Sequence, residues 1–242
     1  MDEQSRLDSI APKYSASVLL GINELYHLAI RDTMIPASGG NRALEIGCGG
    51  GSWTPVLCDK YKTVDVVDGS QKLLSDLVSK CKADNLTVHH CLVEQLASES
   101  VDRWDHAFMT FLMEHLLEPW AVLSQVRPLI AVGGSLFIAV PNANSLHRVI
   151  AQRMGLIEDT TELSDNDHQV GHRRVYTREL LLEHLTQAGF SVEQEWSIGL
   201  KPLTLGQMKE LPDAVGVELA NCGDLAPDYC AYLGLRAVVA EP

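Results

Sequence analysis

The sequence has few basic side chains and no long apolar run. Lysine and arginine together number 19, against 32 aspartate and glutamate residues, which gives a formal net charge of −13 over 242 residues. A protein that holds a phosphate backbone by bulk electrostatics carries the opposite sign, so we expect no nucleic-acid partner. No apolar stretch reaches the roughly 18 residues of a membrane-spanning helix, and we therefore expect no membrane partner.

Cysteine is present but lacks the spacing of zinc or redox sites. None of the six cysteines forms a C-x-x-C pair, and no set of histidines and cysteines has the spacing of a zinc site. This pattern predicts reduced thiols in a cytoplasmic protein. The charged first six residues, MDEQSR, lack the apolar core of a signal peptide. A hydrophobic content of 46% suits one globular domain with a full core.

The most informative stretch is residues 42–52, which read RALEIGCGGGS. Residues 43–46 predict a short buried strand that runs directly into a cluster of glycines. Gly47, Gly49 and Gly51 allow a tight turn with positive φ and bring bare backbone close to a ligand. A helix that starts after Ser52 would direct its first N–H groups at the same ligand. Strand, turn and helix together indicate the nucleotide-binding corner of a doubly wound α/β sheet.

The spacing of the glycines separates two kinds of cofactor. A dinucleotide site needs G-x-G-x-x-G, and Ser52 stands where the third glycine would be. Glu45 lies two positions before the first glycine, and the stretch resembles motif I, (D/E)-x-G-x-G-x-G, of the class I S-adenosylmethionine (SAM) methyltransferases. The resemblance implies that Glu45 and the backbone of Gly47 and Gly49 hold the methionine part of SAM. An ordinary glycine-rich turn is the alternative reading of the same residues.

An acidic residue ends the second predicted strand, residues 63–68. Asp68 follows the glycine turn by roughly 20 residues, the place where a carboxylate accepts hydrogen bonds from ribose hydroxyls. Gly69 and Ser70 complete the resemblance to motif II of the same family. An NAD enzyme would use the same acid, and a helix N-cap is the structural alternative for Asp68.

Later segments extend the resemblance. The stretch after the third strand is similar to the segment where the family reads adenine, which implies a backbone amide near Val93 and a side-chain acceptor near Glu94. The fourth strand, residues 104–110, ends at Thr110 and Phe111, which complete the predicted cofactor site. The following Glu-His-Leu, residues 114–116, resembles a segment frequent in methyltransferases that act on small molecules.

The pattern as a whole predicts an α/β fold with a doubly wound, mostly parallel seven-stranded sheet, and the resemblance to the methyltransferase family implies that its last strand is antiparallel. The predicted strands are residues 43–46, 63–68, 86–90, 104–110, 135–140, 190–198 and 231–240. We expect an N-terminal helical cover over residues 1–40, with a helix at 18–34, and a SAM-binding domain over 41–242. A lid-like insertion is expected at about 142–176, with a mobile acidic loop at 160–168. The segment 199–229 has no predicted role.

His115 is the candidate general base for methyl transfer to an oxygen. It follows the fourth strand at the carboxyl edge of the sheet, and a reference pKa near 6.5 suits proton transfer at neutral pH. With an amine acceptor it would orient the substrate, and helix packing is an equal alternative.

The candidate substrate residues are Tyr14, His147, His172 and Arg173. The basic cluster of residues 172–174 suits a carboxylate or phosphate on the acceptor, although pairing with nearby acids explains it equally well. Tyr14 either closes over the site or packs its helix. The acidic run at 165–168 is typical of a solvated loop, so we predict no metal.

These observations predict SAM-dependent methyl transfer to an oxygen or nitrogen of a small-molecule acceptor, such as a sugar or a natural-product intermediate. The alternatives are an NAD-binding oxidoreductase and a non-catalytic SAM-binding protein. The oligomeric state and the identity of the acceptor are left open by the sequence.

Overall fold

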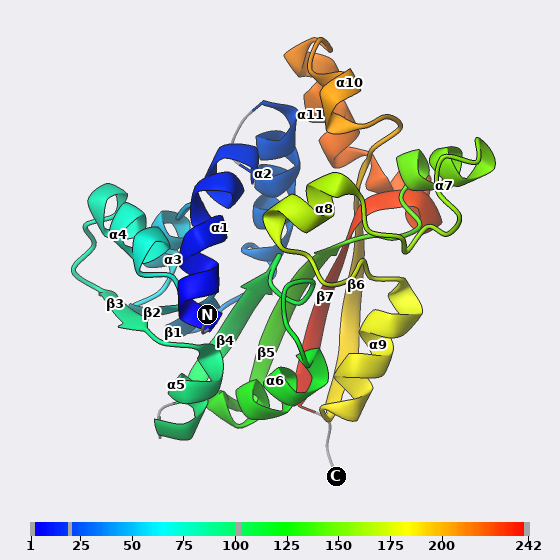
Figure 1. Ribbon diagram of the computed structural model, residues 1–242. Coiled ribbons are helices and arrows are strands. Elements are labelled where there is room, and N and C mark those ends of the chain that lie inside the picture. The colour runs from blue at the N-terminus through cyan, green and yellow to red at the C-terminus, as the bar shows by residue number, and fades with distance from the viewer. Residues whose placement is uncertain (1–2, 19–20, 100–102, 240–242) are drawn as a thin grey trace.

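A computed structural model describes residues 3–18, 21–99 and 103–239, with the side chains of 13–18 and 97–99 excepted. Within this part of the chain, a seven-stranded sheet has the order β3-β2-β1-β4-β5-β7-β6 (Figure 1). β1 to β5 pair in parallel, and β7 is antiparallel to both β5 and β6. The predicted fold class is confirmed. The strands are β1 (Arg42–Ile46), β2 (Thr63–Asp68), β3 (Leu86–His90), β4 (Trp104–Thr110), β5 (Ile130–Pro141), β6 (Phe190–Leu200) and β7 (Cys230–Val239).

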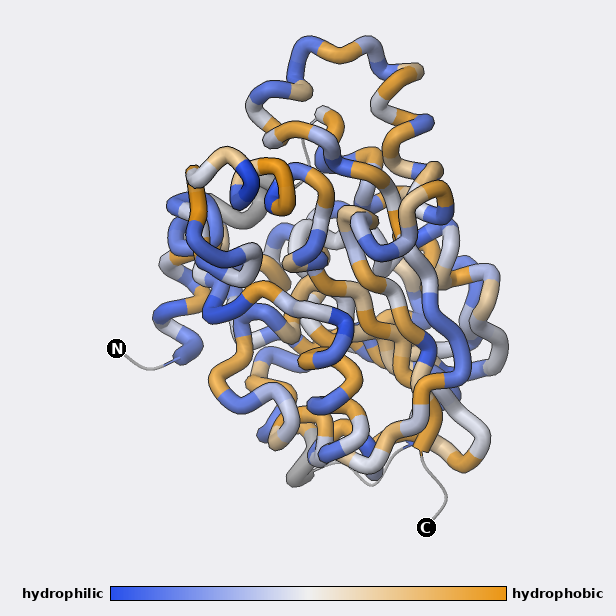
Figure 2. Tube along the Cα trace, turned by 90° about the vertical axis from the view of Figure 1, so that its right-hand side faces the viewer, coloured by the Kyte–Doolittle hydropathy of each residue, from blue (hydrophilic) through white to orange (hydrophobic). Residues whose placement is uncertain are grey.

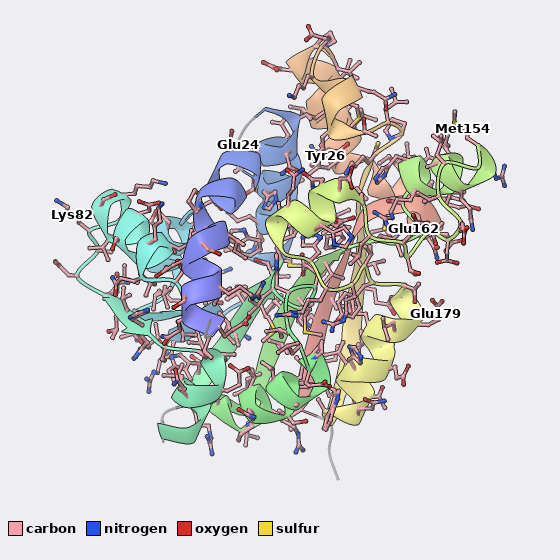
Figure 3. The ribbon with its side chains drawn as sticks, in the orientation of Figure 1. Glu24, Tyr26, Lys82, Met154, Glu162 and Glu179 are labelled. Carbon is pink, nitrogen blue, oxygen red and sulfur yellow. The ribbon has the colours of Figure 1, made fainter. Side chains whose placement is uncertain are left out.

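Helices cover both faces of the sheet and bury two apolar clusters. On one face lie α2 (Ile22–Met34), α3 (Thr54–Lys60), α4 (Gln71–Lys80) and α11 (Asp213–Asn221), and on the other α5 (Val93–Glu99), α6 (Pro119–Val126) and α9 (Arg178–Gln187). Because both faces are covered, the central strands are apolar almost throughout, and Figure 2 shows hydrophobic residues concentrated in the interior. Labelled charged residues such as Lys82, Glu162 and Glu179 lie at the periphery in Figure 3. No helix in the described ranges has the length and apolar character to cross a bilayer.

The N-terminal segment forms two helices where one was predicted. α1 (Glu3–Val18) precedes α2, which begins at Ile22 after Gly21 with a φ of 62°. α1 packs against α4 and against α8 (Asp165–Val170). Tyr26 of α2 is fully buried, and its hydroxyl donates a hydrogen bond to the carbonyl of Leu200 at the end of β6 (Figure 3). A domain boundary at residue 40 stays a prediction.

The insertion after β5 contains α7 (Leu146–Arg153) and α8. The prediction of a mobile acidic loop at 160–168 is wrong in its second half, because residues 165–168 begin α8. Ser164 and Asp167 form a capping box, in which each side chain bonds to the backbone N–H of the other residue. Asp167 is buried and accepts hydrogen bonds from the protein, and it is therefore not part of a solvated loop.

Two further segments differ from the sequence-based expectation. β5 begins at Ile130 rather than at 135, because a β-bulge against β4 lets the strand pass through Gly133 and Gly134. A Cβ at Gly134 would lie 2.4 Å from the carbonyl oxygen of Asp105, so only glycine fits this close approach.

The region 199–229 forms α10 (Leu205–Met208), α11 and short 3₁₀ turns, and α11 packs on α2 and β6.

We expect Asn142→Ala to lower the free energy of unfolding by about 1–3 kcal/mol, the cost of leaving buried polar groups unsatisfied. Asn142 is 3% exposed, its Nδ2 donates to the carbonyl of Cys230 at 2.9 Å, and its Oδ1 accepts from the N–H of Asn144 at 2.9 Å. Urea-induced unfolding measures the change. The exposed Asn221→Ala is the control, with an expected change within about 0.5 kcal/mol. Equal effects of the two substitutions would contradict this account of Asn142.

Candidate active site

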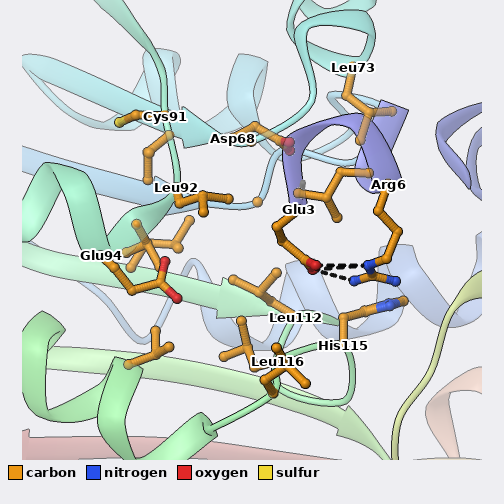
Figure 4. A pocket seen from close by; sticks show the side chains of 18 of the residues that line it. Glu3, Arg6, Asp68, Leu73, Cys91, Leu92, Glu94, Leu112, His115 and Leu116 are labelled. Atoms are coloured by element: carbon orange, nitrogen blue, oxygen red, sulfur yellow. Dashed lines mark hydrogen bonds and ion pairs between the residues drawn. The ribbon is translucent and has the colours of Figure 1, made fainter. Parts of the chain in front are cut away.

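A cavity of about 310 Å³ opens at the carboxyl ends of β1, β2 and β4 (Figure 4). The order of the strands reverses between β1 and β4, which is the point where doubly wound sheets bind ligands. Most of the residues predicted for the cofactor site line this cavity. They are Gly47, Gly49, Asp68, Gly69, Val93, Glu94, Thr110 and Phe111, and His115 joins them.

The glycine turn has the backbone that the sequence predicts. Gly47, Gly49 and Gly51 have φ values of 81°, 52° and 76°. A Cβ at Gly51 would lie 2.8 Å from Cδ1 of Leu77, so the turn also packs tightly on α4. Gly47 and Gly49 present bare backbone to the cavity.

Asp68 joins the end of β2 to the glycine turn. Its Oδ2 accepts a hydrogen bond from the N–H of Cys48 at 3.0 Å, and its Oδ1 accepts from the N–H of Ser70 at 2.8 Å. Burial raises the pKa of this carboxyl above its usual range. The N-cap of α4 is Ser70 rather than Asp68. Ser70 is fully buried, and its hydroxyl donates to Oδ1 of Asp8 in α1 at 2.6 Å, so it is not among the described residues that line the cavity.

Glu45 lies beneath the glycine turn and not on the cavity surface. The side chain is 4% exposed, and the hydroxyl of Thr54 donates to its Oε2 at 2.6 Å. Burial raises the pKa of Glu45 to about 8. A carboxyl in this position supports the turn from behind, and its burial favours the neutral form.

The end of β4 carries a strained residue. Phe111 has a φ of 56°, an unusual conformation for a bulky side chain. Its ring lies 4.0 Å from the ring of His27 and 5.4 Å from that of Tyr232, centroid to centroid. Phe111 lines the first cavity and also a second one, so these contacts fix a side chain at the boundary between the two.

α1 forms one wall of the first cavity. The sequence analysis expected an N-terminal helical cover but did not identify this helix or the residues with which it lines the cavity. Glu3, Arg6, Leu7, Ile10 and Ala11 line it, and Glu3 and Arg6 form an ion pair beside His115 in Figure 4. The helical spacing of Leu7, Ile10 and Ala11 is the signal that predicts such a helix. Tyr14 belongs to α1, but its side chain lies outside the described residues.

The second cavity, of about 720 Å³, lies under the insertion and is markedly polar. His147, Arg148, Asp167, His172 and Lys201 line it, together with Glu114 and Asn142. Burial lowers the pKa of His147 to about 3 and that of Lys201 to about 8. Two of the four predicted substrate residues, His147 and His172, therefore face one cavity.

Arg173 does not line either cavity in the described structure. Its Nε donates to the carbonyl oxygen of His115 at 2.9 Å, and its guanidinium lies 3.6 Å from the carboxylate of Glu3. Arg173 therefore holds the turn after β4 against α1 and the insertion.

Glu114 and His115 separate the two cavities. Glu114 lines the second cavity and His115 the first, and their side chains are 1% and 7% exposed. Burial raises the pKa of Glu114 to about 7 and lowers that of His115 to about 3. The ring of His115 lies 4.8 Å from that of His172, in an edge-to-face arrangement.

The sequence matches the model of one protein family, described as a methyltransferase domain, over residues 24–195. A ubiquinone biosynthesis O-methyltransferase from Coxiella burnetii (strain Dugway 5J108-111) is 27% identical over 106 residues, which are 43% of this chain and 45% of that protein. The chain thus aligns with less than half the length of this relative.

Two solved structures show the same fold. One is an S-adenosylmethionine-dependent methyltransferase from Mesorhizobium loti, with a TM-score of 0.64, 16% identity, and coverage of 90% of this chain and 99% of the other. The second is the N-methyltransferase NodS from Bradyrhizobium japonicum WM9 in complex with S-adenosylhomocysteine, with a TM-score of 0.63, 14% identity, and coverage of 99% and 100%.

The family match covers well over half of the chain and agrees with the glycine turn, Asp68 and the strand order. It confirms the predicted resemblance to a methyltransferase family. The chain belongs to the methyltransferase domain family.

Proposed function

We propose that this chain transfers a methyl group from SAM to an oxygen or nitrogen of a small-molecule acceptor. The observation that carries the proposal is the pair of cavities that meet at Phe111 and at the Glu114–His115 turn. The first cavity has the glycine turn and Asp68 of a nucleoside site. The second is roomy and polar, as suits an acceptor.

In the proposed complex, Asp68 accepts hydrogen bonds from the ribose hydroxyls of SAM. The backbone of Gly47, Gly49 and Gly69 lies along the cofactor, with Ser70 behind it as the cap of α4. Val93 and Glu94 contact adenine, and the side chain of Glu94 points into the cavity in Figure 4. Thr110 and Phe111 then lie next to the reactive sulfonium.

The acceptor site in this proposal is the second cavity. Lys201 and Arg148 line it, so an acceptor with an acidic group fits better than a cationic one. The curated relative is named an O-methyltransferase and NodS an N-methyltransferase. We favour oxygen, because the relative is the more similar of the two in sequence.

Catalysis in such a site depends largely on position. Holding the acceptor lone pair in line with the breaking S–CH₃ bond contributes about 7–11 kcal/mol through effective molarity. The methyl carbon passes to the acceptor, and the electron pair of the broken bond stays on sulfur.

The role of His115 as general base stays a prediction. Its position on the wall of the cofactor cavity suits the role, but a pKa of about 3 is far from the value near the working pH at which proton transfer is most effective. Tyr14, His147, His172 and Arg173 as substrate contacts also stay predictions. The comparisons do not support the NAD-binding alternative.

The expectations about location and partners also stay predictions. None of the six cysteines, which all lie in the described ranges, forms a disulfide bond, and the chain carries a formal charge of −13. A cytoplasmic enzyme with a small-molecule acceptor and no nucleic-acid partner agrees with these properties.

We expect SAM and S-adenosylhomocysteine, but not NAD, to raise the thermal stability of the protein. A ligand at 100 times its Kd adds about 2.7 kcal/mol to the free energy of unfolding.

Asp68→Asn should weaken SAM binding about 10- to 100-fold, since hydrogen bonds to a charged group contribute about 1.5–3 kcal/mol. The exposed Asp84→Asn is the matched control. Calorimetric titration gives the affinities, and transfer of labelled methyl from SAM to candidate acceptors tests the reaction. Stabilisation by NAD alone would contradict the proposal.

We expect Glu45→Gln to remove a pH dependence of stability in the ligand-free protein. The pKa of Glu45 is about 8 in the folded chain and near 4.5 when unfolded. As the pH rises, the unfolded state therefore loses this proton at a lower pH than the folded state does. Between pH 5 and 8 this difference lowers the unfolding free energy of the wild type by up to about 1.4 kcal/mol for each pH unit. The stability of wild type relative to Glu45→Gln should accordingly fall over this range.

Urea unfolding at several pH values measures this difference, with the exposed Glu179→Gln as a control that shows no such trend. A flat difference between wild type and Glu45→Gln would mean that Glu45 is ionised when folded. SAM affinity of the same variant tests the sequence-based prediction that Glu45 helps to hold the cofactor, and unchanged affinity would refute that prediction.

A further inference from the structure

We propose that Glu114, His115 and His172 bind one divalent transition-metal cation in the wall between the cofactor and acceptor cavities. One ligand atom from each of the three residues lies within 4.8 Å of the other two. Bonds of about 2.0–2.2 Å at tetrahedral angles place the ligand atoms of one ion about 3.3–3.6 Å apart. The three donors therefore need to approach one another by up to about 1.5 Å to surround an ion.

The hydrogen bonds of both histidines favour a metal ligand at Nε2. Nδ1 of His172 lies 2.8 Å from Oδ1 of Asp167, and Nδ1 of His115 lies 3.3 Å from the carbonyl oxygen of Gly171. Carboxylate and carbonyl oxygens only accept, so the proton of each neutral ring belongs on Nδ1 and the lone pair on Nε2. Histidines that bind metals typically donate their other N–H to such groups.

The carboxylate of Glu114 supplies an independent observation. Its side chain is 1% exposed, and neither of its oxygens has a hydrogen-bond partner on any other described residue. Burying a carboxylate without a partner is costly, and such groups are normally paired or bound to a metal. A cation next to Glu114 would satisfy both oxygens.

Backbone hydrogen bonds keep the two ligand segments together. The N–H of Arg173 donates to the carbonyl of Glu114 at 2.8 Å, and the N–H of His172 donates to the carbonyl of Asp167 at 2.8 Å. The side chain of Arg173 also bonds to the carbonyl of His115. The turn after β4 and the turn after α8 are thereby fixed against each other, as a metal site requires.

Two imidazoles and one carboxylate suit zinc, manganese, cobalt or iron better than magnesium, which prefers oxygen ligands. Three protein ligands leave a coordination position open. Glu114 and His172 also line the acceptor cavity, so an acceptor hydroxyl can take that position. This part of the inference rests on the proposed function.

A cation in this position favours methyl transfer to oxygen. It lowers the pKa of a bound hydroxyl, which releases its proton to water. An oxygen lone pair then forms the bond to the methyl carbon, and the C–S bonding pair stays on sulfur. In this arrangement His115 is a metal ligand and not the base.

Cobalt titration of chelator-treated full-length protein tests the site. We expect one Co²⁺ per chain, with visible absorption bands, and competition by Zn²⁺. Glu114→Gln and His172→Ala should each weaken Co²⁺ binding at least about 10-fold, while the exposed Glu179→Gln and His90→Ala should not. Thermal unfolding of each variant checks that it is folded, and His172→Ala is the test if Glu114→Gln does not fold.

Absence of stoichiometric Co²⁺ binding would overturn the inference, as would binding that survives both Glu114→Gln and His172→Ala. SAM binding, measured on the same samples, separates this result from the proposed function. Failure of SAM to bind while Co²⁺ binds would refute the proposed methyl transfer and leave the metal site standing. SAM binding without Co²⁺ binding would refute the metal site and leave the proposed methyl transfer standing.

Discussion

The reversal of strand order between β1 and β4 is the constraint on which both cavities depend. Parallel strands on either side of this point send their following segments to opposite faces, and a crevice remains at their carboxyl ends. The glycine turn and Asp68 fill one side of that crevice. The Glu114–His115 turn extends from the end of β4 and divides the remaining space into the cofactor and acceptor cavities.

The cofactor half could be predicted from the sequence because its signals are local. The glycine turn and Asp68 each follow a strand directly, and strand pairing alone brings them together. The acceptor half depends on contacts between distant segments, such as the hydrogen bond from the N–H of Arg173 to Glu114. No local spacing indicates that Glu114 and His172 meet, so the expectation that the chain has no metal site rested on the cysteine and histidine spacings and on the acidic run at 165–168.

The acidic run at 165–168 shows how a few residues outweigh the composition of a segment. Its polarity alone suggested a solvated loop. Ser164 and Asp167 instead satisfy the first N–H groups of α8 through a capping box. In the expected N-terminal cover, Leu7 and Ile10 give α1 enough apolar surface to pack on the cofactor cavity.

The contrast between Glu45 and Glu114 bears on the chemistry of the site. Both carboxyls are almost completely buried within the same domain, at 4% and 1% exposed. Glu45 has the hydroxyl of Thr54 as a donor and lies beneath the glycine turn, so burial in the neutral form is adequately compensated. Glu114 has no donor on any other described residue, yet it faces a polar cavity beside two histidines whose Nδ1 atoms already have hydrogen-bond partners. A buried carboxyl with a purely structural role is expected to have a hydrogen-bond donor beside it, as Glu45 does. The arrangement around Glu114 is instead the one that a cation would complete.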